Sequence, residues 1–149
     1  MLRGACLWLR AFWHDCHAKR GGCRCAARRW IIAPDLNAFR KANGKSPLAA
    51  DARLARAAQA HASDMASKTY FSHTGQDGSS VGDRVKRQGY GYCFVAENIA
   101  QGQKGALQAL AGWQKSAGHR KNMLSELAIH FGMAEANGYW VMVLGKTGC

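Results

Sequence analysis

The apolar positions between residues 34 and 123 recur mainly at the three- and four-residue spacing of amphipathic helices. A first helix is predicted to start at Pro34-Asp35 and to end at Asn43-Gly44. An alanine-rich helix is predicted over residues 51–67, with Asp51 near its N-cap. Further helices are predicted over residues 81–88 and 105–115, and a short one follows Ser116.

Two continuous apolar runs, residues 128–136 and 139–145, follow and are joined by Asn137-Gly138. That dipeptide favours a tight hairpin turn, because both central residues of a type I′ turn need positive φ. The second run is apolar on both faces, so the predicted strand needs cover on both sides. The predicted fold class is therefore α+β: a three-layer α-β-α sandwich around a small antiparallel sheet.

The first thirty residues do not share this pattern. They hold seven Lys/Arg and one Asp, a net charge of 7 − 1 = +6, and residues 31–149 carry 14 − 8 = +6. Dense Trp, Cys and Arg without periodicity predict a disordered or misassigned segment over residues 1–30 and one domain over residues 31–149. Cys16, His17, Cys23 and Cys25 lack a usual zinc-finger spacing.

No targeting or membrane segment is visible in this sequence. Charged residues break every apolar run of the first thirty residues, unlike a secretory signal, and no run approaches the ~20 apolar residues of a membrane helix. The net charge of +12 suits nucleic acid, anionic lipid or an anionic cell wall, and charge alone does not choose among them. A basic, solvated surface is the simplest interpretation.

Two cysteines lie beyond the N-terminal segment, Cys93 and Cys149. We predict that they form one structural disulfide that holds the C-terminus, which implies an oxidising compartment. The alternative is a pair of unrelated thiols. His61 lies on the apolar stripe of the 51–67 helix, and a core histidine with one hydrogen bond is favoured there over a ligand.

Three short motifs each contribute one titratable side chain with site chemistry. They are Tyr70-Phe71-Ser72-His73, Glu97-Asn98-Ile99-Ala100 and Gly118-His119-Arg120-Lys121-Asn122. Two imidazoles and a carboxylate brought together by a fold can ligate a divalent metal or move a proton.

With their flanking residues, these motifs resemble the CAP superfamily of cysteine-rich secretory proteins, venom antigens and plant pathogenesis-related proteins, in particular its short bacterial branch. The resemblance covers residues 35–146. The further residues that carry it, in family order, are Leu36-Asn37, Arg40, Gly44, Pro47-Leu48, Ala60-His61-Ala62, Asp64-Met65-Ala66, Asp83-Arg84, Gly89-Tyr90, Trp113 and Ser116.

The resemblance implies an α-β-α sandwich with an open cleft that holds His73, Glu97 and His119. In several members of the family the two cleft histidines bind zinc, so weakly bound Zn²⁺ at His73 and His119 is expected. Ser116 stands where many relatives carry a second glutamate, and Asp83 is a candidate for that carboxylate.

The resemblance leaves two functions open. The first is a secreted or periplasmic cleft domain that binds a small ligand, a lipid or a cell-wall polymer and has no robust catalysis. The second is a zinc-dependent hydrolase acting on peptide or cell-wall substrates. Catalytic zinc usually has three protein ligands, and two histidines supply only two, so binding is favoured over catalysis. We expect a monomer without specific nucleic-acid binding and with no transmembrane segment.

Overall fold

The computed structural model describes residues 32–148, so the predictions for residues 1–30 and for Cys149 lie outside the described residues. In chain order the elements are α1 (Ala33–Ala42), β1 (Ala49–Ala50), α2 (Ala52–Lys68), α3 (Val81–Arg87), β2 (Phe94–Gln101), α4 (Ala106–Lys115), α5 (Ala117–Met123), β3 (His130–Ala136) and β4 (Tyr139–Lys146). The strands form one sheet in the order β1-β3-β4-β2, which leaves β2 at an edge.

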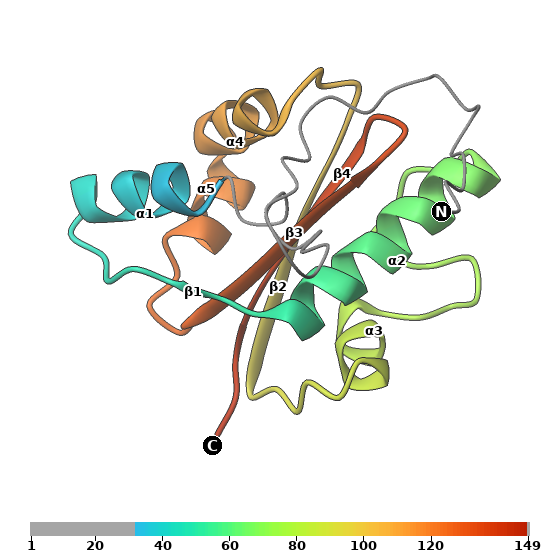
Figure 1. The fold of residues 1–149 in the computed structure, drawn as a ribbon, viewed down its shortest axis with the longest axis horizontal. Coiled ribbons are helices and arrows are strands. Elements are labelled where there is room, and N and C mark those ends of the chain that lie inside the picture. Colours follow the sequence, from blue (N-terminus) through green and yellow to red (C-terminus); the bar gives the residue numbers. More distant parts are fainter. Residues whose placement is uncertain (1–31, 149) are drawn as a thin grey trace, which may run out of the picture.

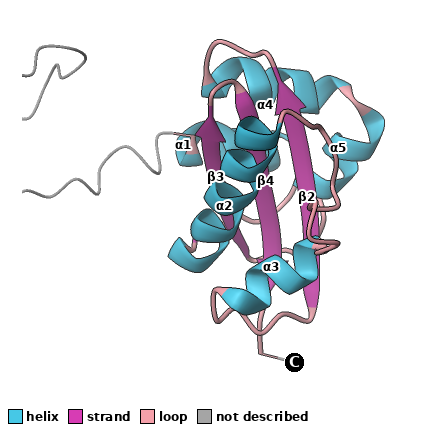
Figure 2. Ribbon diagram, turned by 90° about the vertical axis from the view of Figure 1, so that its right-hand side faces the viewer, coloured by secondary structure: helices cyan, strands magenta, loops and turns pink. Residues whose placement is uncertain are grey.

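The sheet lies between two helical layers, as the apolar pattern of its last strand predicted. Figures 1 and 2 show α2 and α3 over one face and α1, α4 and α5 over the other. Alternate residues of β4 serve the two layers: Val141 and Val143 belong to the core cluster beneath α2 and α3, whereas Met142 and Leu144 belong to the other cluster. The α+β, three-layer architecture is therefore confirmed.

The hairpin that closes the chain is also as predicted. Asn137 and Gly138 have φ values of 47° and 83°, the positive φ that a type I′ turn requires. The turn sets the register of the antiparallel β3–β4 pair, in which Ala136 lies opposite Tyr139. This register puts Gly132 beneath α2, where an added Cβ would overlap the backbone nitrogen of Ala55. The close packing of α2 on β3 therefore depends on a glycine at this position.

Two features of the sheet differ from the sequence prediction. Residues 94–101, to which the apolar pattern assigned no element, form β2, the antiparallel neighbour of β4. Its centre holds Glu97 and Asn98, two polar residues that are nevertheless buried, and these interrupt the apolar pattern by which strands are recognised. The sheet is also not wholly antiparallel, because the two-residue strand β1 pairs with β3 in parallel.

Candidate functional site

The candidate site is built on edge strand β2, whose consecutive residues Glu97 and Asn98 serve opposite faces of the sheet. Glu97 lies opposite Val143, a residue of the core beneath α2 and α3. Asn98 lies opposite Met142, a residue of the core beneath α4 and α5. Because directly opposed residues of an antiparallel pair point to the same face, each side chain meets a different helical layer.

The carboxylate of Glu97 is buried and fully engaged. Nη2 of Arg84 lies 2.9 Å from Oε2 and 3.1 Å from Oε1, and Nδ1 of His73 lies 2.9 Å from Oε1. Glu97 and Arg84 are each only 6% exposed. A buried ion pair is maintained only when good geometry and further hydrogen bonds compensate for the lost hydration of both charges.

Arg84 supplies those further hydrogen bonds and thereby fixes the loop that carries His73. Its Nη1 donates to the carbonyl of Ser79 at 2.8 Å, and its Nη2 donates to the carbonyl of His73 at 2.9 Å. One guanidinium on α3 therefore holds the Glu97 carboxylate, the backbone of His73 and the end of the 72–80 loop.

His73 is held at one ring nitrogen and open at the other. Its Nδ1 faces a carboxylate that can only accept, so Nδ1 carries the proton and donates to Glu97. In the neutral ring the lone pair then lies on Nε2. Because the side chain is 58% exposed, this nitrogen belongs to a ring that solvent can reach.

A network of side-chain amides holds α5 on the other side of β2. Nδ2 of Asn98 donates to the carbonyl of His119 at 3.1 Å, and Nδ2 of Asn122 donates to Oδ1 of Asn98 at 2.9 Å. Nε1 of Trp113 donates to the carbonyl of Ile99 at 3.1 Å, and Nδ2 of Asn122 lies 3.3 Å from the carbonyl of Glu97. Side chains thus satisfy two backbone carbonyls of the edge strand and position α5.

His119 is part of α5 and lies near His73 in electrostatic terms. Burial lowers the pKa of His119, and the charge on His73 lowers it further. Its ring centroid lies 6.5 Å from that of Trp113. The imidazole is therefore neutral at neutral pH, the form that ligates metal or accepts a hydrogen bond.

His61 reaches the Glu97 network from α2. The residue is 1% exposed, and its Nε2 lies 2.9 Å from the carbonyl of Ser72 and 3.9 Å from Oε1 of Glu97. Burial lowers the pKa of His61, although the charge of Glu97 opposes that shift. This geometry is that of the core histidine with one hydrogen bond that the sequence favoured.

Two sequence candidates have other contacts. Asp83 is exposed and forms a capping box at the N-terminus of α3, where its Oδ2 accepts from the backbone nitrogen of Ser80 at 2.9 Å. Ser116 is the N-cap residue of α5, but its side chain makes no capping hydrogen bond. The Asp83 carboxylate therefore serves the start of its own helix, and this role differs from the cleft role that the resemblance suggested.

Arg84 is the site residue that sequence reasoning left without a role. A signal was available, because Val81, Arg84 and Val85 have the three- and four-residue spacing of one helix face. An arginine on an apolar face needs a buried acid, and Glu97 is that acid.

Neither zinc nor the disulfide pairing is settled by the described residues. Over residues 32–148 no group of three or more His, Cys, Asp or Glu side chains is arranged to hold a metal. Cys93 is disulfide-bonded, but every other cysteine of the chain lies outside the described residues. The pairing with Cys149 therefore stays a prediction.

The family model of the cysteine-rich secretory proteins, CAP, matches residues 35–143. The chain therefore belongs to the CAP family. It is 38% identical over 113 residues to protein YkwD of Bacillus subtilis, a match that covers 74% of this chain and 44% of YkwD. It is 32% identical to the membrane protein YlbC of the same organism, a match that covers 70% of this chain and 30% of YlbC. The chain thus spans less than half the length of either relative.

Solved structures agree with the fold. An extracellular protein with an SCP domain from Bacillus anthracis superposes with a TM-score of 0.77 at 31% identity, over 80% of this chain and 40% of that one. An outer surface protein of Borrelia burgdorferi superposes with a TM-score of 0.72 over 79% of this chain and 91% of that one. At 18% identity the Borrelia protein shows the fold alone. Within residues 32–148, no helix has the length and apolar character needed to span a membrane.

Proposed function

We propose that this CAP domain is a ligand-binding module of a secreted or cell-envelope protein, and that its cleft does not perform robust catalysis. The observation that carries the proposal is the state of Glu97, whose two carboxylate oxygens are both bound by Arg84 while Oε1 also accepts from His73. The extracellular location is proposed by likeness to the Bacillus anthracis protein, which is extracellular and shares 31% identity.

The same contacts argue against the hydrolase alternative. A general base must reach the proton that it abstracts at hydrogen-bond distance. The Glu97 carboxylate is 2% exposed and hydrogen-bonded to Arg84 and His73, so no oxygen of it is left for a water molecule. We infer that Glu97 is a positioning residue that fixes the ring of His73.

A weakly held zinc ion fits the residues of the cleft. Glu97 orients His73 through Nδ1, and this carboxylate–histidine arrangement is typical of zinc ligands. His119, with its pKa lowered by burial, would supply the second neutral imidazole. When bound, the ion would supply positive charge that attracts an anionic or carbonyl group of a ligand. Two protein ligands are one fewer than most catalytic zinc sites have, so weak binding is expected.

Calorimetric titration with ZnCl₂ tests the metal part of the proposal. We expect weak binding near pH 7 that decreases toward about pH 5, because both imidazoles must lose protons to ligate. His73→Ala should abolish binding. The matched control is His130→Ala, since that ring contacts Tyr90 on a different part of the sheet. Zinc binding by His73→Ala equal to that of wild type would remove His73 from the site.

A pull-down on purified bacterial cell wall tests the ligand class. The net charge of +6 over residues 31–149 suits an anionic polymer, and retention should fall as salt shortens the Debye length below its ~8 Å at physiological ionic strength. A second assay measures cleavage of peptide and cell-wall substrates with zinc present. Cleavage that is lost in Glu97→Gln would establish the hydrolase and contradict the proposal.

A further inference from the structure

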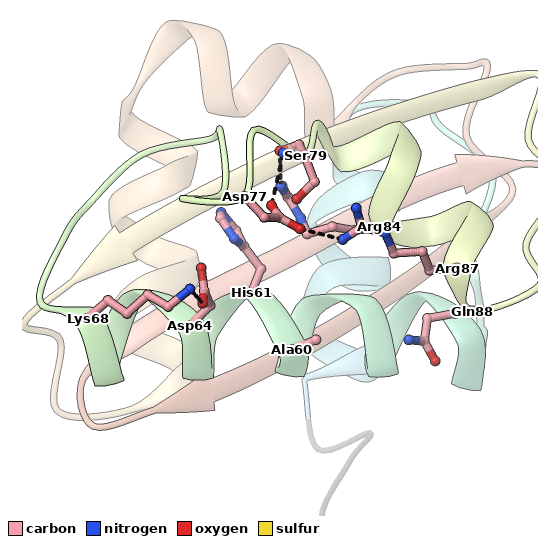
Figure 3. A pocket seen from close by; sticks show the side chains of 9 residues that line it. All are labelled: Ala60, His61, Asp64, Lys68, Asp77, Ser79, Arg84, Arg87 and Gln88. Carbon is pink, nitrogen blue, oxygen red and sulfur yellow. Dashed lines mark hydrogen bonds and ion pairs between the residues drawn. The ribbon is translucent and has the colours of Figure 1, made fainter.

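A polar cavity of about 220 Å³ lies between α2, α3 and the 72–80 loop. Figure 3 shows the ring of His61 projecting from α2 toward the segment that carries Asp77 and Ser79. The cavity is lined by Ala60, His61, Asp64, Lys68, Asp77, Ser79, Arg84, Arg87 and Gln88. None of His73, Glu97 and His119 lines it, so it is a different site from the cleft.

The charges of this cavity are balanced pair by pair. Lys68 lies 2.6 Å from Asp64, and Arg87 lies 2.7 Å from Asp77. Arg84, the remaining cation of the wall, is paired with Glu97. A lone anion would meet two carboxylates and a lone cation three basic groups, so a neutral polar molecule suits these walls better than a simple ion.

One buried atom of the cavity wall lacks a partner. Nε2 of His61 faces the carbonyl of Ser72, which can only accept, so Nε2 carries the proton. Burial lowers the pKa of His61, so the ring is neutral and its Nδ1 bears a lone pair. Nδ1 is buried and has no hydrogen-bond partner among the described residues. A buried acceptor without a donor is costly, so the site requires a hydroxyl or an N–H group at this point.

We propose that this cavity binds a small, neutral, polyhydroxylated molecule of the polyol or monosaccharide class. One hydroxyl donates to Nδ1 of His61, and the others exchange hydrogen bonds with the amide of Gln88 and the rim ion pairs, since a hydroxyl both donates and accepts. The volume is far above the ~10–15 Å³ that one water needs and below the ~300–1,000 Å³ of pockets for larger ligands. That size suits a single sugar ring.

The experiment titrates histidine-labelled protein with myo-inositol and with D-glucose, following the imidazole nitrogens by NMR. We expect a saturable shift of the His61 Nδ1 resonance through the millimolar range, with shifts in the backbone amides of Ala60 and Gln88. Sodium phosphate and tetramethylammonium chloride, added to matched ionic strength, should leave Nδ1 unchanged. His73→Ala should bind the probes like wild type, which separates this site from the cleft.

Ala60→Phe is the blocking variant, because Ala60 is solvent-exposed on α2 and a larger side chain there can enter the cavity without disturbing the core. We expect it to weaken probe binding at least about tenfold. Ala111→Phe, at an exposed position of α4, is the matched control and should bind normally. Gln88→Ala removes a wall amide and should also weaken binding.

Three results would overturn the proposal. A shift that does not saturate would show that water alone satisfies Nδ1. Equal binding by Ala60→Phe and wild type would place the polyol elsewhere, and a saturable response to phosphate alone would make the cavity an anion site.

Discussion

Glu97 and Asn98 are neighbours on one strand, yet they build two unlike networks on the two faces of the sheet. Glu97 is held by charged partners, Arg84 and His73, and these contacts fix the loop between α2 and α3. Asn98 is held by neutral partners, Asn122 and the His119 backbone, and these contacts fix α5. The comparison teaches that one edge strand aligns both walls of the cleft, one wall through ionic bonds and the other through amides.

The largest effect is expected from breaking the ionic side. Arg84→Met leaves the Glu97 carboxylate buried without a cation, and removing one partner of a buried pair costs about 3–5 kcal/mol. Urea denaturation should show this loss in the free energy of unfolding. The control is Arg87→Met, since its ion pair with Asp77 is exposed and should contribute little. The double variant Arg84→Met with Glu97→Met should recover much of the loss, and failure to do so would mean that Arg84 acts mainly through the 72–80 loop.

A smaller effect is expected on the amide side. Asn98→Ala removes a buried amide and leaves the carbonyl of His119 and the amide of Asn122 without their partner, which should cost about 1–3 kcal/mol in urea denaturation. No charge is left unpaired, which is why the loss should be smaller than that of Arg84→Met. A loss as large as that of the ionic variant would show that the two networks do not differ in the way proposed here.

The pH dependence of stability should sharpen the contrast. The pKa values of His61 and His119 are lowered in the folded state, chiefly by burial. Their contribution is therefore complete above the unfolded pKa of ~6.5 and is lost as pH falls through the folded values, with a slope of at most ~1.4 kcal/mol per pH unit for each group. His61→Gln should flatten the profile below about pH 6.5, measured by urea denaturation across a pH series. The loss caused by Asn98→Ala should stay constant over that series, because amides do not titrate.

The helices and the hairpin could be predicted because their signals are local. Residues 51–67 combine helical spacing, alanine and an N-cap aspartate, and the observed α2 is Ala52–Lys68 with Asp51 accepting from the first turn. Strand β2 could not be found in this way. Its buried Glu97 and Asn98 owe their burial to partners on other elements, and a pattern of apolar positions does not contain that information.

The site was predictable to the same extent. The motifs identified His73 and Glu97, and the structure brings these two side chains together at 2.9 Å. They did not reveal the role of Arg84, because its partner lies 13 positions away on another element and only the fold pairs them. The placement of Asp83 as a second carboxylate rested on residue type alone. Its local partner, Ser80, three residues earlier, could have indicated a capping box.

The smallest effect is expected where a carboxylate belongs to neither network. Ser80→Ala removes the cap of α3 and should lower the free energy of unfolding by about 1 kcal/mol. Asp83→Ala breaks the same capping box from its other end and should destabilise α3 in the same direction. Because the Asp83 carboxylate caps its own helix, Asp83→Ala should leave zinc affinity unchanged when His73→Ala abolishes it. Calorimetry on both variants makes the distinction. Weaker zinc binding by Asp83→Ala, with an unfolding free energy close to that of Ser80→Ala, would restore Asp83 to the cleft and add a third acidic or imidazole group to it.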